Sequence, residues 1–150
     1  MKKNIFYLII LLFFTFIFTI FYIGLDKPNF YTPKEIKNKS LEEFTSTELF
    51  SNEQFSSSDI IENNKFTLVN IWSSWCVPCR LEHSVLMDLS EKTDLNIVGL
   101  NYKDKKNNAI KFLNELGNPF SKILTDPDGI ISISLGAYGV PETFLLNNKS

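Results

Sequence analysis

The sequence predicts an α/β domain with a largely parallel sheet, preceded by one long apolar helix. Residues 5–25 form an apolar run without a charged side chain. Residues 66–72 are nearly continuously apolar and rich in β-branched side chains, as a strand buried on both faces is, and residues 95–101 are predicted to form a second buried strand. Helical periodicity separates these strands, and the alternation of strand and helix favours parallel pairing through right-handed crossovers.

Length and charge exclude several classes of protein. The chain has 150 residues, which is enough for one domain with appended segments. After the apolar run, 13 Lys and Arg face 17 Asp and Glu, because two of the 15 basic residues precede the run. This balance argues against a nucleic-acid-binding protein, which would present a basic face. The two cysteines are too few for a multi-disulfide scaffold or a four-cysteine zinc site.

The apolar run is interpreted as an uncleaved transmembrane anchor. Its 21 residues span ~31 Å at a rise of ~1.5 Å per residue, which matches a hydrocarbon core of ~30 Å. A cleaved signal peptide has a shorter apolar region and a small-residue cleavage site, and Gly24 to Pro28 offers no such site. We expect residues 1–4, with Lys2 and Lys3, to stay in the cytoplasm. The single-pass chain then crosses a bacterial inner membrane, and its larger part lies in the periplasm.

The remaining chain divides into a juxtamembrane linker at 26–43 and a domain at 44–150. The first half of the domain is predicted to contain a short strand at 44–50, a turn-like stretch at 51–58, a helical turn at 59–63 and the strand at 66–72. The second half is predicted to contain a helix at 78–90, the strand at 95–101, a helix that is capped by Asp104 and ends at Gly117, a strand at 120–124, turns at 126–129 and 147–150, and a strand at 143–146. The apolar face of the helix at 78–90 is assigned to Leu81, Val85, Leu86 and Leu89.

Cys76 and Cys79 form a C-x-x-C motif between a buried strand and a helix, and that context is informative. The helix N-terminus favours a thiolate at Cys76, and a thiolate attacks disulfides. Cys79, one turn deeper, then resolves the mixed disulfide. A purely structural disulfide is a weaker interpretation, because so short a loop constrains little of the unfolded chain. Cys76, Cys79 and His83 also have a metal-ligand spacing, so a metal site is the other alternative. We expect a redox-active disulfide with no metal and no further cofactor.

Four further residues are considered for roles near the cysteines. Glu82 lies on the same side of the predicted helix as Cys79, where a desolvated carboxylate accepts the proton of the Cys79 thiol. The alternative interpretation of Glu82 is a solvated surface residue. His83 is expected to be a partly exposed packing residue. Asn70 lies in the middle of an apolar strand, so its amide is either satisfied locally or faces the redox site. Pro141 precedes a predicted strand and is a candidate for a cis peptide bond, with an ordinary trans turn as its alternative.

Four segments of the predicted domain resemble a known family. Residues 68–83, 98–104, 116–119 and 136–144 are similar to the corresponding segments of thioredoxin-like proteins, and more narrowly to the cytochrome c biogenesis thiol:disulfide interchange proteins, the CcmG/DsbE group. The resemblance covers about residues 44–147 and implies a thioredoxin-like fold, with a central mixed sheet flanked by helices.

The resemblance also implies roles for site residues. Cys76 is then the nucleophile and Cys79 the resolving thiol. Pro141 is then the cis proline that shapes the substrate groove. The residues expected to tune the redox pair or to line the groove are Glu82, Glu142, Trp75, Pro78 and Asn70. Asn70 falls where general thioredoxins carry a buried aspartate, which leaves proton transfer to the glutamates.

The implied function is a membrane-anchored protein-disulfide reductase. It would reduce disulfides in apocytochrome c, or in a heme-ligation partner that holds it, and a membrane thiol reductant of the DsbD/CcdA type would re-reduce it. A related reductase for oxidase assembly or spore formation, and a non-enzymatic metal chaperone using Cys76, Cys79 and His83, are the alternatives. Family members continue with another strand and a helix, so we expect a domain that lacks both and a fragment of residues 26–150 that is marginally stable.

Overall fold

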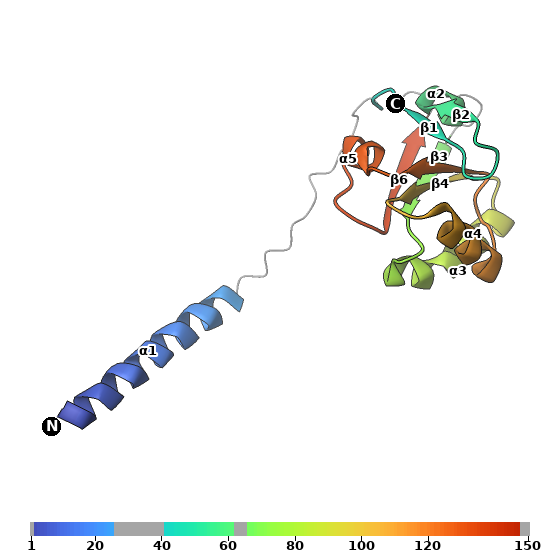
Figure 1. Cartoon of the computed structure of the whole chain (residues 1–150). Coiled ribbons are helices and arrows are strands. Elements are labelled where there is room, and N and C mark those ends of the chain that lie inside the picture. Colours follow the sequence, from blue (N-terminus) through green and yellow to red (C-terminus); the bar gives the residue numbers. More distant parts are fainter. Residues whose placement is uncertain (1, 26–40, 62–65, 148–150) are drawn as a thin grey trace. The chain divides into compact units, whose positions relative to one another are not determined.

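The computed structural model describes residues 2–25, 41–61 and 66–147, which form two units (Figure 1). The first unit is helix α1 (Lys2–Leu25), as the apolar run predicts. Its stretch Lys3–Leu25 has a mean hydropathy of 2.7, so it is long and apolar enough to cross a membrane. Thr15 and Thr19 donate their hydroxyls to the carbonyls of Leu12 and Thr15 in the same helix, at 2.9 and 2.7 Å. Most of the predicted linker, residues 26–40, lies outside the described residues.

The second unit is built on a four-stranded mixed sheet with the strand order β5-β4-β3-β6. The strands are β3 (Phe66–Trp72), β4 (Asn96–Tyr102), β5 (Lys122–Asp126) and β6 (Glu142–Asn147). β3 pairs with β4 and β4 with β5 in parallel, whereas β6 is antiparallel to β3. The predicted α/β class with a mixed sheet is therefore confirmed. Asn147 belongs to β6, and the rest of the turn predicted at 147–150 lies outside the described residues.

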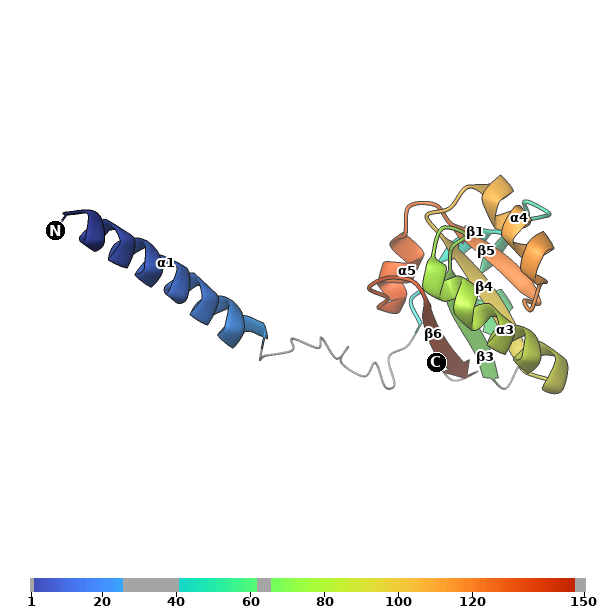
Figure 2. The ribbon, with the colours of Figure 1, turned by 90° about the horizontal axis from the view of Figure 1, so that it is seen from below.

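Each face of the sheet has its own hydrophobic core. Helices α3 (Val77–Lys92) and α4 (Lys106–Leu116) cover one face, where the two cysteines and Trp72 are buried (Figures 1 and 2). Helices α2 (Ser57–Ile61) and α5 (Ile130–Leu135) contribute to the core on the other face. The turn from β3 to α3 therefore carries the cysteines at the carboxyl end of a central strand.

The turn-like stretch predicted at 51–58 contains a strand, so that prediction is wrong. β2 (Gln54–Ser56) pairs antiparallel with β1 (Thr45–Thr47). The composition of this stretch is polar, so its sequence gives no sign of a strand. The pairing is instead supported by contacts from outside the hairpin. Leu49 donates its N–H to the carbonyl of Ile123 at 2.8 Å, which ties the hairpin to β5.

Helix α5 is absent from the elements predicted from sequence. Its residues alternate Ile and Ser, a pattern without helical periodicity. The helix forms because the carboxylate of Asp126 accepts the backbone N–H groups of Ile131 at 3.3 Å and Ser132 at 2.8 Å at its first turn. Those donors lack partners within the helix, and Asp126 supplies them from the end of β5.

The buried face of α3 differs from the predicted one. Leu81 is 75% exposed and Val85 58% exposed, although both were assigned to the apolar face. The buried residues of α3 are Cys79, His83 and Leu86. These positions follow the spacing i, i+4, i+7, so the buried cysteine determines which side of α3 packs on the sheet.

Candidate active site

Cys76 and Cys79 are joined by a disulfide at the start of α3, with their Cα atoms 5.3 Å apart. Cys76 is the N-cap residue, and its sulfur accepts the backbone N–H of Cys79 at 3.1 Å. Pro78 occupies the first turn, where a missing N–H costs no helical hydrogen bond. Both cysteines are nearly buried, at 5% and 2% exposure. This N–H and the positive end of the helix dipole would both stabilise a thiolate at Cys76.

A tight turn brings the chain from β3 to Cys76. The N–H of Cys76 donates to the carbonyl of Ser73 at 3.2 Å, and the residues between them are Ser74 and Trp75. Trp75 is 57% exposed. Its indole N–H donates to the carbonyl of Lys103 at 3.1 Å, and its ring lies 6.4 Å from that of Tyr102. The predicted groove residue Trp75 is thus held at the surface beside the disulfide.

Asp104 contacts the turn before Cys76 and does not cap α4, contrary to what its position in the sequence predicted. The N-cap of α4 is Lys105, which makes no side-chain capping bond, so the predicted cap at Asp104 is wrong. The Asp104 carboxylate instead accepts the backbone N–H of Ser74 at 2.6 Å and its hydroxyl at 2.8 Å. The local sequence gives no sign of a contact between residues 30 positions apart.

Asn70 is fully buried in β3 and faces α3. Its amide nitrogen donates to the Glu82 carboxylate at 2.9 Å and to the Thr143 hydroxyl at 3.0 Å. Among the described residues, its Oδ1 atom has no hydrogen-bond partner. Glu82 is half-buried. The amide nitrogen of Asn70 is therefore satisfied by side chains of α3 and β6, and one of these is the candidate redox-tuning residue Glu82.

The Val140–Pro141 peptide bond is cis, as expected for the residue before β6. The next residue, Glu142, has a role that its sequence position did not reveal. Its Oε1 atom accepts the backbone N–H groups of Tyr138 at 2.7 Å and Gly139 at 3.1 Å. Glu142 therefore ties the two ends of the loop around the cis proline together.

His83 is buried, at 3% exposure, so the expected partial exposure is wrong. Its Nε2 atom lies 3.0 Å from the carbonyl oxygen of Gly117, and its ring meets that of Phe112 edge-on at 5.0 Å. It is a packing residue, as expected. Across residues 2–25, 41–61 and 66–147, no group of three or more His, Cys, Asp or Glu side chains is arranged to hold a metal ion.

Comparisons with known proteins agree with this geometry. A family model described as Redoxin matches residues 36–150. The thiol:disulfide interchange protein CycY of Rhizobium leguminosarum bv. viciae is 54% identical over 82 residues, which cover 55% of this chain and 44% of CycY. The chain spans less than half the length of CycY and of several DsbE proteins.

Two further matches cover more of the chain. The crystal structure of a DsbF homologue from Corynebacterium diphtheriae matches with a TM-score of 0.64 and 27% identity, over 82% of both chains. The probable thiol:disulfide interchange protein DsbE-2 of Pasteurella multocida (strain Pm70) is 34% identical over 146 residues, which cover 97% of this chain and 76% of that protein. The chain therefore belongs to the redoxin family, among the thioredoxin-like proteins of the DsbE group.

Proposed function

We propose that this protein is a membrane-anchored thiol:disulfide oxidoreductase that works as a reductant in cytochrome c maturation. The observation that carries the proposal is the Cys76–Cys79 disulfide at the N-terminus of α3, with a backbone N–H directed at the Cys76 sulfur. Relatives named thiol:disulfide interchange proteins support the same chemistry. The disulfide is the only redox group that the proposal requires, so no further cofactor takes part.

The reduced protein exchanges thiols in two balanced steps. The Cys76 thiolate attacks one sulfur of the substrate disulfide, the substrate S–S bond breaks, and the other substrate sulfur leaves as a thiolate that takes up a proton. The Cys79 thiolate then attacks the Cys76 sulfur, and the second substrate sulfur leaves in the same way. The substrate gains two electrons and two protons, and the protein ends in its disulfide form.

Glu82 is the proposed proton acceptor for the second step. Cys79 is 2% exposed, so its thiol needs a nearby base before it becomes a nucleophile. Glu82 follows Cys79 by one helical turn on the same side of α3. The amide of Asn70 holds one carboxylate oxygen of Glu82, which directs the carboxylate towards the buried side of the helix.

The proposed substrate is apocytochrome c, or a heme-ligation partner that holds it. Heme attachment needs both thiols of a C-x-x-C-H motif in the reduced state, and an oxidising compartment closes them. The surface offered to such a polypeptide comprises Trp75 and the loop that ends in the cis Pro141. Each turnover leaves the Cys76–Cys79 disulfide, so we infer re-reduction by a membrane thiol reductant of the DsbD/CcdA type.

The proposed location is the periplasmic side of the bacterial inner membrane. Helix α1 provides a span of sufficient length and hydropathy. The basic residues Lys2 and Lys3 precede the span, which favours a cytoplasmic N-terminus. The domain with the disulfide then lies outside the cytoplasm, where thiols require a dedicated reductant.

A trapping experiment tests the proposal. The full-length Cys79→Ser variant, expressed in cells that make c-type cytochromes, is expected to accumulate a mixed disulfide through Cys76, and mass spectrometry of the trapped species identifies the substrate. The matched Cys76→Ser variant lacks the attacking thiol and is expected to trap at most a tenth as much. Trapping of oxidase-assembly or sporulation proteins in place of apocytochrome c would overturn the substrate, and equal trapping by both variants would overturn the roles of the thiols.

A further inference from the structure

We propose that Asp104 is a positioning residue that holds the turn before Cys76 and so fixes where the attacking sulfur lies. The proposal rests on the exchange activity proposed above and adds a residue to it. Its basis is a set of hydrogen bonds between the loop that follows β4 and both central residues of the Ser73–Cys76 turn.

The Asp104 carboxylate accepts four hydrogen bonds. Its Oδ2 atom accepts the backbone N–H of Ser74 at 2.6 Å and the side-chain amide of Asn101 at 3.2 Å. Its Oδ1 atom accepts the Ser74 hydroxyl at 2.8 Å and the backbone N–H of Lys105 at 2.8 Å. A carboxylate offers about four lone-pair sites, and all are used here, two of them by Ser74. Because Asn101 is 3% exposed and lies in β4, the carboxylate is held against the sheet.

The neighbouring Lys103 holds the other central residue of the turn. Its carbonyl accepts the indole N–H of Trp75 at 3.1 Å, and its own N–H donates to the carbonyl of Asp126 at 2.9 Å. Lys103 has φ 44°, a left-handed conformation that is uncommon for a residue with a side chain. The surrounding hydrogen bonds maintain this conformation, and strained backbone of this kind is concentrated at functional sites.

The consequence for Cys76 is geometric. Its N–H bonds to Ser73, and Ser74 and Trp75 are each fixed to the 101–104 segment, so the Cys76 backbone has little freedom. A sulfur held close to Cys79 has a high effective concentration towards it. Loss of the Asp104 contacts should therefore lower the equilibrium constant for forming the Cys76–Cys79 disulfide.

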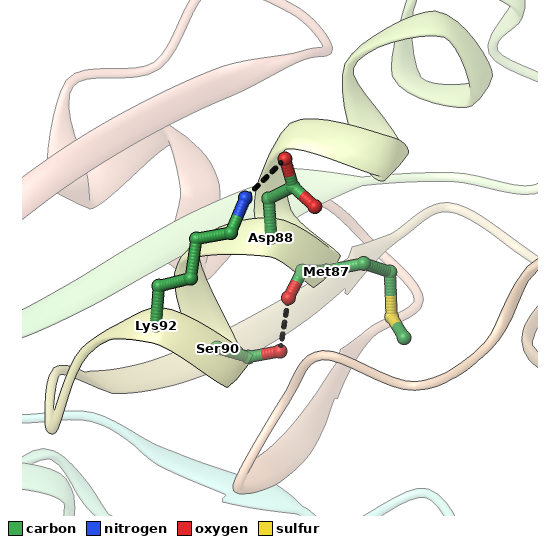
Figure 3. A network of polar contacts seen from close by, with 4 residues as sticks. All are labelled: Met87, Asp88, Ser90 and Lys92. Atoms are coloured by element: carbon green, nitrogen blue, oxygen red, sulfur yellow. Dashed lines mark hydrogen bonds and ion pairs between the residues drawn. The ribbon is translucent and has the colours of Figure 1, made fainter.

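The test uses the full chain, purified in detergent, and measures that equilibrium constant against the glutathione couple. Asp104→Ala removes all four acceptor sites. Asp104→Asn keeps an oxygen for Ser74 and Asn101, and its NH₂ donates to the Ser74 hydroxyl, so only the bond from Lys105 is lost. The control is Asp88→Asn on α3, where an exposed carboxylate pairs with Lys92 at 3.0 Å (Figure 3). Asp88 lies 12 residues after Cys76, or ~18 Å along the helix.

We expect the constant to fall at least fivefold in Asp104→Ala and to stay within twofold of wild type in Asp104→Asn and Asp88→Asn. A value for Asp104→Ala equal to that of Asp88→Asn would overturn the proposal. The pH profile of Cys76 alkylation separates position from charge: a constant that falls equally in the Ala and Asn variants, together with equal shifts of the profile, would show that only the charge matters, and would also overturn it.

Two further outcomes are decisive. If Asp104→Ala does not fold, Ser74→Ala takes its place, since it removes one of the two bonds from Ser74; a two- to threefold fall supports the proposal, and an unchanged constant overturns it. Wild-type protein that exchanges with no disulfide at all would overturn the proposed function, whereas normal exchange with an unaffected Asp104→Ala variant would overturn only the positioning role.

Discussion

Asn70 and Glu82 are bonded across the interface between β3 and α3, with the amide nitrogen 2.9 Å from the carboxylate oxygen. The second amide hydrogen of Asn70 is directed at the Thr143 hydroxyl at 3.0 Å, so one residue links a central strand, the active-site helix and β6. These two acceptors fix which end of the amide faces the carboxylate, because a flipped amide would direct its oxygen at Glu82. The carboxylate is therefore held in one orientation one helical turn after Cys79.

The first prediction concerns Glu82. Glu82→Gln keeps the hydrogen bond from Asn70 but removes the base. General bases typically contribute about 10²–10⁴-fold to a rate, so we expect resolution of the mixed disulfide to slow by at least about tenfold. The measurement is the decay rate of a mixed disulfide with a small thiol, sampled by acid quenching and mass spectrometry.

The control for Glu82 is Glu91→Gln, an exposed glutamate near the end of the same helix. It changes the net charge of the protein by the same amount and should leave the decay rate within twofold of wild type. Equal rates in the two variants would show that the carboxylate at Glu82 takes no proton from Cys79.

The second prediction separates two roles for Glu142. One carboxylate oxygen of Glu142 accepts the N–H groups of both Tyr138 and Gly139, so Glu142 acts there as an acceptor and also as a negative charge. Glu142→Gln retains that oxygen as an acceptor, so the free energy of unfolding should change by less than about 0.5 kcal/mol. Glu142→Ala removes the shared acceptor of both hydrogen bonds, each worth about 0.5–1.5 kcal/mol net, and should cost about 1–3 kcal/mol. Urea denaturation measures both values. A Gln variant as unstable as the Ala variant would mean that the negative charge, and not the acceptor geometry, matters.

The third prediction concerns His83, which sequence spacing allowed as a metal ligand. His83→Ala removes a buried ring between aromatic side chains and leaves the Gly117 carbonyl without its partner, so we expect a loss of about 2–3 kcal/mol in unfolding free energy. Leu81→Ala, at a 75% exposed position on the same helix, should change it by less than about 0.5 kcal/mol. Thiol exchange should persist in both variants. Loss of exchange in His83→Ala with its stability retained would contradict a packing role.

The sequence predicted what depends on local pattern. β3 has the predicted bounds because its residues are apolar and β-branched and the strand is central in the sheet, and the helix-start position of Cys76 follows from the strand, the C-x-x-C motif and Pro78. The cis bond at Pro141 was also expected, although the family resemblance contributed most of that expectation.

The failures arise where distant residues decide the outcome. Asp104 lies where a helix cap is usual, yet its strongest partner is Ser74, which only the adjacency of β3 and β4 brings close. Leu81 has the spacing of a core residue, yet the buried Cys79 turns a different side of α3 inward. In both cases packing across the sheet outweighs local periodicity.

The last prediction concerns Gly99, in the middle of β4. A Cβ atom there would lie 2.8 Å from Nε1 of Trp72 and 3.0 Å from the ring of Phe120. These two rings are stacked with centroids 5.6 Å apart, and Phe112 packs on Trp72 at 5.0 Å. Trp72 is 2% exposed, so its indole has little space into which it could move. The absence of a side chain at Gly99 therefore leaves room beside β4 for the aromatic rings that pack in the same core as the disulfide.

Gly99→Ala should lower the unfolding free energy by about 1–3 kcal/mol, the usual cost of an added methyl group in a packed core. Gly139→Ala is the matched control, because a Cβ atom there meets nothing within 4 Å. Tryptophan fluorescence during urea unfolding gives the free energy of both variants and reports on the surroundings of the two indoles, Trp72 and Trp75. If Gly99→Ala proved as stable as Gly139→Ala, Trp72 and Phe120 would have to move apart at no cost. That result would contradict a core in which the stacked rings of β3 and the segment before β5 fix each other's position.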